Sequence, residues 1–190
     1  LYLCNKNLET ISDYDSNNAR HKLLAEVCMA AKYEGDSIKT RYTPYQQIYG
    51  DSPSQICTML ARSFADIGDI VRGKDLYLGN KGEKKKREDL EKNLKTIFKK
   101  IHEDLVQNKK DAKDHYNDPK GDFFKLREDW WTLNRRDVWK AITCKAEQNN
   151  KYFRNTACAG KTPTQGKCRC DDNPNTDPPT YFDYVPQYLR

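Results

Sequence analysis

The sequence is poor in apolar residues and has no long apolar run. Of its 190 residues, 36% are hydrophobic and 33% are charged, and the mean hydropathy is −1.03. It shows neither a secretory signal pattern nor an apolar stretch long enough to cross a bilayer. The alternation typical of strands is nearly absent and no internal repeat is visible, which argues against a β-sandwich or a repeat array.

Patterns typical of catalysis are missing as well. There is no Gly-rich phosphate-binding loop, and none of the three histidines lies near a Ser or Cys in a nucleophile context. Histidines on amphipathic helices are usually packing or surface residues, and we interpret His21, His102 and His115 in this way. The chain is therefore predicted not to be an enzyme and to need no cofactor.

Two carboxylate pairs could suggest acid–base chemistry. We interpret Asp66 and Asp69 as part of a solvated helix face, and Asp171 and Asp172 as part of a turn. On the same face, Arg62 is expected to pair with Asp66, and Asp69 with Arg72.

Aromatic residues, and apolar residues at helical spacing, can form a core despite the low apolar content of the chain. The chain holds 12 Tyr, 6 Phe and 3 Trp, which bury large areas and can build the core of one ordinary domain. Apolar residues recur at helical spacing in two segments. The first set is Ile56, Met59, Leu60, Phe64, Ile67, Ile70 and Val71, and the second is Leu90, Leu94, Ile97, Phe98, Ile101 and Leu105.

The remaining boundaries follow from capping and stop signals. One helix is expected from a cap at Asn18 to about Glu34, with Gly35 as its stop, and residues 40–53 are expected to be a connector or short helical turn. Another begins at Pro53 and ends at Gly73. Asp122 is expected to cap a helix containing Trp130, Trp131 and Leu133, with a further helical piece near Asp137 that contains Trp139. These aromatics cover more than one face, so the element is predicted to be central, whereas residues from 149 onward are loop-rich.

Seven cysteines indicate disulfide crosslinks in an oxidising setting. They are Cys4, Cys28, Cys57, Cys144, Cys158, Cys168 and Cys170. The number is odd, and Cys4 is the natural residue without a partner in this chain. Cys168 and Cys170 are too close in sequence to bond each other easily, so they are expected to reach two different partners among Cys57, Cys144 and Cys158. Zinc is disfavoured, because Cys-x-Cys is not a usual knuckle spacing and the histidines lie far away.

The positive charge is concentrated in one segment. The net charge of the chain is +6, and residues 81–110 hold 10 Lys and 1 Arg against 6 Asp and Glu, a net of +5. A lysine-rich helix is commonly just a solvated face, but such a run can also bind polyanions. A disulfide-built domain lies where nucleic acid normally does not, so sulfated glycan is preferred over nucleic acid as its partner. The candidate glycan-binding residues are Lys81, Lys84, Lys85, Lys86, Arg87, Lys92, Lys95, Lys99, Lys100, Lys109 and Lys110.

Five phrases spread over nearly the whole chain resemble one known family. They are Leu23–Gly35, Ala61–Gly79, Lys125–Trp131, Val138–Cys144 and Pro179–Arg190. Together they resemble the Duffy-binding-like domain, alpha class, of the variant erythrocyte membrane protein one family of the malaria parasite. The resemblance implies an all-α, disulfide-stapled helical bundle with long irregular loops. It implies that residues 1–50 are the remainder of a first subdomain and the entry to a second, that residues 51–190 are the second subdomain, and that a third is absent from this excerpt.

The resemblance also implies a function. Members of this family are antigenically variable adhesins on the surface of infected red cells, held in the membrane by other parts of the parent protein and exposed to antibodies. Alpha-class members bind heparan sulfate, red-cell receptors or blood-group glycans and cause rosetting. We therefore expect a host-receptor-binding module of cytoadhesion. The alternative is an antigenic and structural scaffold whose receptor contacts lie in the absent parts.

Overall fold

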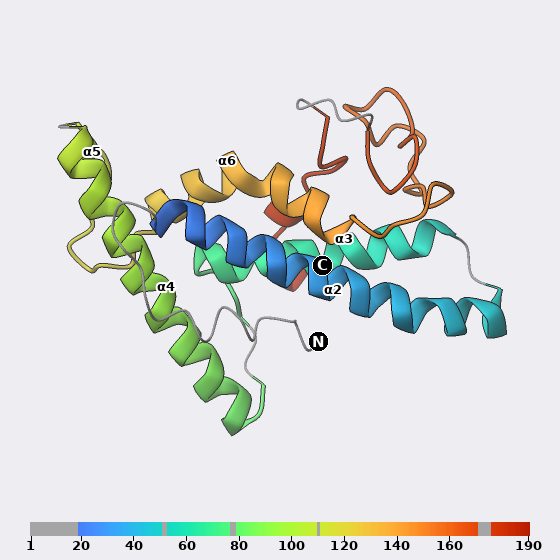
Figure 1. The fold of residues 1–190 in the computed structure, drawn as a ribbon, viewed down its shortest axis with the longest axis horizontal. Helices are drawn as coiled ribbons and strands as arrows, with labels where there is room; N and C mark the ends of the chain where they lie inside the picture. Colours follow the sequence, from blue (N-terminus) through green and yellow to red (C-terminus); the bar gives the residue numbers. More distant parts are fainter. Residues whose placement is uncertain (1–18, 51–52, 77–78, 110, 171–175) are drawn as a thin grey trace.

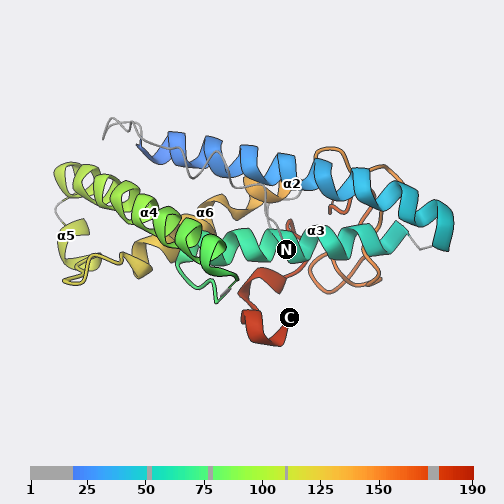
Figure 2. The same cartoon turned by 90° about the horizontal axis from the view of Figure 1, so that it is seen from below.

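The computed structural model describes residues 19–50, 53–76, 79–109, 111–170 and 176–190. These residues form helices α2 (Ala19–Tyr49), α3 (Pro53–Arg72), α4 (Lys81–Asn108), α5 (Ala112–His115) and α6 (Phe124–Ile142), then the 3-10 turns η2 (Phe182–Tyr184) and η3 (Gln187–Leu189). Helices α2, α3 and α6 pack on one another, and α4 crosses them obliquely (Figures 1 and 2). No strand occurs in the described ranges, which confirms the all-α prediction.

The tryptophans of α6 form the centre of the core, as predicted. Trp130, Trp131 and Trp139 are each at most 3% exposed. Phe64 of α3 lies with its ring centroid 5.1 Å from that of Trp131 and 5.2 Å from that of Trp139. Aromatic side chains therefore fill the space between the helices that a chain with few aliphatic residues would otherwise leave open.

Two apolar residues expected in these helices face solvent instead. Leu133 of α6 is 80% exposed, and Met59 of α3 is 41% exposed. Both lie outside the buried stripe of their helix, so helical spacing alone assigned too many apolar residues to the core.

Helix α2 is longer than the sequence suggests, because Gly35 does not end it. The helix continues through Gly35 and Pro44 to Tyr49, so the expected connector over residues 40–53 is wrong up to residue 49. An ideal Cβ on Gly35 would lie 2.0 Å from the carbonyl oxygen of Ile142. The glycine is thus required for the close approach of α2 to α6, and it does not act as a C-cap. The expected cap, Asn18, lies outside the described residues.

Helix α6 begins differently from the prediction and is continuous. Its N-cap is Phe123, in a left-handed conformation, and Asp122 makes no cap. Instead the Asp122 carboxylate lies 2.6 Å from Lys95 Nζ, and Asp118 Oδ2 accepts a hydrogen bond from the Phe123 N–H at 2.7 Å. The piece expected to start near Asp137 is part of the same helix, which runs unbroken to Ile142.

The carboxylates of α3 are not a solvated face, which corrects the prediction. Asp69 is 3% exposed, and its Oδ1 lies 2.8 Å from Arg72 Nη2. The guanidinium of Arg190 binds both Asp69 and Asp66, the latter at 3.1 Å. Asp69 thus pairs with Arg72 as predicted, whereas Asp66 pairs with Arg190 and, among the described residues, forms no ion pair with Arg62. Burial raises the pKa of Asp66, and the charge of Arg190 opposes that rise.

A buried carboxylate in η2 ties the C-terminal segment to α6. Asp183 is fully buried and accepts hydrogen bonds from Trp131 Nε1 at 2.9 Å and from Arg135 Nε at 2.8 Å. Its backbone carbonyl accepts a hydrogen bond from Arg72 of α3. The C-terminal segment that contains η2 and η3 packs on α3, on the side away from α2 (Figure 2).

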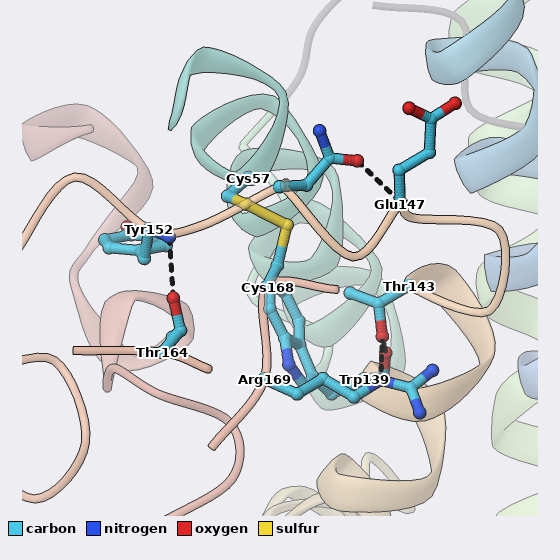
Figure 3. Close-up of a disulfide and its surroundings, with 9 residues drawn as sticks. Cys57, Trp139, Thr143, Glu147, Tyr152, Thr164, Cys168 and Arg169 are labelled. Carbon is cyan, nitrogen blue, oxygen red and sulfur yellow. Dashed lines mark hydrogen bonds between the residues drawn. A yellow bond between two sulfur atoms is a disulfide. The ribbon is translucent and has the colours of Figure 1, made fainter. Parts of the chain in front are cut away.

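Two disulfides hold the loop that follows α6. Cys57 of α3 bonds Cys168 (Figure 3), and Cys158 bonds Cys170. As expected, Cys168 and Cys170 reach different partners. Next to them, Arg169 donates to the Lys140 carbonyl and to Thr143 Oγ1, each at 2.7 Å, so the loop is docked on the end of α6.

Two other cysteines named as disulfide candidates have free thiols. Cys28 is partly buried in α2, and Cys144 is exposed just beyond α6. Burial, and to a lesser degree the charge of Asp137, raises the pKa of Cys28 to about 11. Cys4 and the pair Asp171 and Asp172 lie outside the described residues.

Helix α2 shares its core with the rest of the chain. It packs against α3 and α6, and Leu23, Val27 and Ile38 belong to the same buried cluster as the tryptophans. The assignment of residues 1–50 and 51–190 to two subdomains stays a prediction. Among the helices in the described ranges, none combines the length and apolar character that crossing a bilayer requires.

Candidate ligand-binding surface on helix α4

Helix α4 starts with a capping box that the sequence analysis missed. Asn80 Oδ1 accepts hydrogen bonds from the N–H groups of Gly82 and Glu83, both at 3.0 Å, and Glu83 Oε2 accepts one from the Asn80 N–H at 2.9 Å. The signal was present, since Asn followed three residues later by Glu is a known helix start. The helix therefore begins at Lys81.

The apolar stripe of α4 faces the core, as its spacing predicts. Its buried residues are Leu90, Leu94, Ile97, Phe98 and Ile101. The ring of Phe98 lies 6.2 Å from that of Trp130 in an edge-to-face arrangement. The lysines are consequently turned away from α6 and toward solvent.

Arg127 of α6, which is fully buried, fixes the position of α4. Its guanidinium donates to both carboxylate oxygens of Glu91, at 2.7 and 2.9 Å. It also donates to the carbonyls of Val71, at 2.6 Å, and Ile70, at 3.0 Å, at the end of α3. One side chain thus joins three helices through a bidentate ion pair and two backbone contacts, and periodicity gives no sign of it.

The predicted glycan-binding residues fall into three groups. Seven are exposed on or just after α4, and these are Lys81, Lys84, Lys85, Lys86, Lys92, Lys99 and Lys109. Three are partly buried, and these are Arg87, Lys95 and Lys100. Lys110 lies outside the described residues.

Ion pairs withdraw some of these cations from the surface. Arg87 Nη1 lies 3.2 Å from Asp75 Oδ2, with both side chains less than a fifth exposed. Lys95 lies 2.6 Å from Asp122, whose pKa is lowered mainly by the hydrogen bond from that lysine. Lys92 lies 3.6 Å from Asp89. Arg87 and Lys95 therefore serve the fold, and the sequence could not distinguish them from the exposed lysines.

The first two turns of α4 carry the strongest uncompensated charge. Lys81, Lys84, Lys85 and Lys86 are exposed there, and none has an ion-pair partner in the part of the chain that the structure describes. The N-terminal end of a helix is itself positive, so lysines at this end are unfavourable for folding and acidic residues would be preferred. Glu83, the acidic residue of the first turn, is held in the capping box. We name these four lysines the lysine cluster.

Chemically, the lysine cluster suits binding of an anion. The described residues contain no group of histidine, cysteine and carboxylate side chains that could hold a metal ion. His102 packs its ring 5.5 Å from that of Phe123, and His115 lies on the short helix α5, with Nε2 3.9 Å from Asp129. These contacts agree with the interpretation of His102 as a packing residue and of His115 as a surface residue.

Comparison with known proteins gives consistent relatives. The family model of the Duffy binding domain matches residues 1–190, whereas no curated protein matches the sequence. The NTS-DBL1(alpha-1) domain of Plasmodium falciparum membrane protein 1 (PfEMP1), varO strain, has 42% identity and a TM-score of 0.78, over 98% of this chain and 39% of that one. The NTS-DBL1-alpha and CIDR-gamma double domain of the same strain has the same identity and TM-score, over 99% of this chain and 25% of that one.

A third relative was solved with a bound receptor. It is a DBLb domain of PfEMP1 bound to human ICAM-1, with 32% identity and a TM-score of 0.58, over 75% of this chain and 31% of that one. In each comparison the present chain spans well under half of the solved chain. These relatives are adhesion domains and not members of an enzyme family. Because the family model covers every residue and the alpha-class structure superimposes on nearly the whole chain, the chain belongs to the Duffy-binding domain family.

Proposed function

We propose that this chain is a receptor-binding module of an adhesin on the surface of the infected red cell, and that the lysine cluster binds sulfated glycan or a red-cell glycoconjugate. The observation that carries the proposal is the set of four exposed lysines at the positive end of α4. Their placement works against helix stability, so a function in anion binding explains it better than solubility does. Membership of an adhesion family supports the same class of function.

The physical basis is multivalent electrostatics. A sulfated chain carries regularly spaced negative charges, and each lysine that neutralises one of them releases a condensed counterion. Affinity then falls steeply with salt, in proportion to the number of contacts. The surface needs no deep pocket for this, because lysine acts as a flexible point charge.

The test is heparin affinity measured at several NaCl concentrations. Changing Lys81, Lys84, Lys85 and Lys86 together to Gln is expected to lower the slope of log affinity against log salt by roughly 3, since each lost contact removes about 0.7–0.9. These residues are exposed, so the circular dichroism spectrum should be unchanged and the melting temperature should not fall.

The matched control removes lysines from a different surface. Lys151, Lys161 and Lys167 are exposed in the disulfide-linked loop, and changing them to Gln should leave most of the heparin affinity. The lysine cluster is not the site if both variants lose heparin affinity in proportion to the number of charges removed. It is also not the site if the variant of the lysine cluster keeps the slope of log affinity against log salt.

The chain's limited coverage of its relatives favours a second candidate. It spans 39% of the alpha-class structure, and Tyr181 and Tyr188 near its end are 73% and 75% exposed. In this second candidate the chain is an antigenic scaffold and the receptor contacts lie in the remainder of the domain. Binding to red cells by the longer domain, but not by this chain, with heparin affinity unchanged by the lysine variant, would favour the scaffold.

A further inference from the structure

A cavity lies between α2 and α3, and neither the ion pairs nor the core described above accounts for it. Its volume is about 280 Å³, close to the lower end of the usual range for ligand pockets. We name it the arginine pocket, after the two cations on its rim. Its lining residues come from four positions of α2 and three of α3, namely Glu34, Ser37, Ile38, Arg41, Met59, Arg62 and Ser63.

The floor of the arginine pocket is fixed. Glu34 is 4% exposed, and its Oε1 accepts a hydrogen bond from Ser63 Oγ at 3.0 Å, which joins the two helices. Ile38 is buried beside it at 8% exposure. The floor is therefore an apolar surface next to a held carboxylate, and a ligand's anionic group would be repelled from this depth.

The rim is cationic and uncommitted. Arg41 and Arg62 are both exposed, and within the described ranges no ion pair engages either guanidinium. Guanidinium groups bind carboxylates through two parallel hydrogen bonds. A ligand's carboxylates would thus remain at the rim while an apolar group entered above Ile38.

The residues around the pocket are those that protein interfaces favour. Met59 lines it and is 41% exposed, and methionine and arginine are both enriched at interfaces.

We propose that the arginine pocket is a docking site for a partner protein, and that it takes a peptide segment in which a bulky apolar side chain is flanked by acidic residues. The apolar side chain packs on Ile38 and Met59, and the acidic residues pair with Arg41 and Arg62. A sulfated glycan satisfies the rim but leaves the apolar floor unused, so the lining favours a peptide. The inference does not depend on the lysine cluster, which lies on a different helix.

The test begins with selection of random linear peptides displayed on phage, using the whole chain as bait. Selection is followed by counter-selection on a variant with Arg41→Gln and Arg62→Gln. Enriched peptides are expected to combine a bulky apolar residue with neighbouring Asp or Glu. If no sequence is enriched, or if the enriched sequences carry no acidic residue, the proposal is wrong.

The enriched peptides are then synthesised, and their affinity is measured by fluorescence anisotropy. The double arginine variant should bind them at least about tenfold more weakly, as loss of charge-assisted hydrogen bonds predicts. Met59→Ala should also weaken binding. Lys32→Gln, an exposed change on α2 away from the pocket, should not. All these substitutions are at exposed positions, so an unchanged melting temperature shows that folding is intact.

Charge reversal separates recognition from a general electrostatic effect. Arg62→Glu should abolish binding of the acidic peptide. A peptide whose acidic residues are changed to Lys should instead bind this variant. Removal of the lysine cluster should leave peptide binding intact, so this proposal and the proposed function can fail independently. Two results together would make the pocket a glycan site and the peptide proposal wrong. Heparin binding would require Arg41 and Arg62, and the selected peptides would fail to compete with heparin.

Discussion

Arg127→Met tests whether one buried guanidinium holds the lysine-bearing helix on the domain. Methionine keeps an unbranched apolar stem of similar length, so the experiment removes the polar interactions while leaving much of the packing. Arg127 is fully buried, and it contacts Glu91, Ile70 and Val71. The variant therefore removes, at a single residue, polar contacts that join α6 to both α3 and α4.

The magnitude follows from what each partner loses. The Val71 carbonyl would be left in a buried position without this donor, at a cost of about 1–3 kcal/mol. The Ile70 carbonyl loses less, because it still accepts a hydrogen bond from the Gly73 N–H at 3.1 Å. Glu91 loses two charge-assisted bonds, but its side chain is 34% exposed and water can solvate it. We expect a total loss of about 3–5 kcal/mol in the free energy of unfolding, as for other broken buried pairs.

The assay is urea unfolding followed by the fluorescence of the buried tryptophans, with an unchanged m-value as the check for a two-state comparison. Glu91→Gln, which keeps the acceptor but removes the charge, should cost about 1 kcal/mol. The double variant should reveal a coupling energy between the two sites of about 0.5–3 kcal/mol.

Two results would refute this reasoning. A loss below about 1 kcal/mol for Arg127→Met would mean that the four hydrogen bonds contribute little. Full stability of Arg127→Lys would mean that a point charge suffices and that the planar fork of arginine is not needed at this position.

Three further predictions concern the cysteines. Changing Cys57 and Cys168 together to Ala should lower the free energy of unfolding by about 2–5 kcal/mol, because the bond closes a loop of 111 residues and restricts the unfolded chain; equal denaturant midpoints for the variant and the parent would contradict this. Iodoacetamide should modify Cys144 before Cys28, because Cys144 is exposed, whereas a pKa near 11 in place of 9.0 lowers the thiolate fraction of Cys28 about 100-fold at neutral pH. The same shift means that the native state keeps the Cys28 proton after the unfolded chain has lost it, so stability should fall as the pH rises from about 9 to 11, and a Cys28→Ala variant should lack this slope. Peptide mapping by mass spectrometry measures the labelling order, and faster labelling of Cys28 would contradict it.

The sequence predicts much of the helical architecture, because apolar periodicity reports directly which side of a helix is buried. The stripe from Leu90 to Ile101 is buried as its spacing indicates, and the aromatics of α6 are central. The stop of α3 at Gly73 and the loop-rich character after residue 149 also follow from local signals. In each case the information lies within a few turns of the chain.

Predictions based on local signals were wrong where a distant residue changed their meaning. Gly35 has the chemistry of a helix stop, but it serves a close contact with Ile142. Asp66 and Asp69 have the spacing of a solvated face, but Arg190 covers them. No property of residues 60–70 could reveal a partner that lies 121 positions from Asp69 and 124 from Asp66 in the chain.

The sequence by itself determined the all-α class, the positive charge of residues 81–100, and the presence of disulfide crosslinks with separate partners for Cys168 and Cys170, since composition, period and residue chemistry are local properties. Only the tertiary structure decided which cysteines bond, which cations are withdrawn into ion pairs with Asp75 and Asp122, and where α2 and α3 leave a pocket between two arginines. These outcomes depend on distances between segments that are far apart in the chain, and such distances are set by the packing of the whole core.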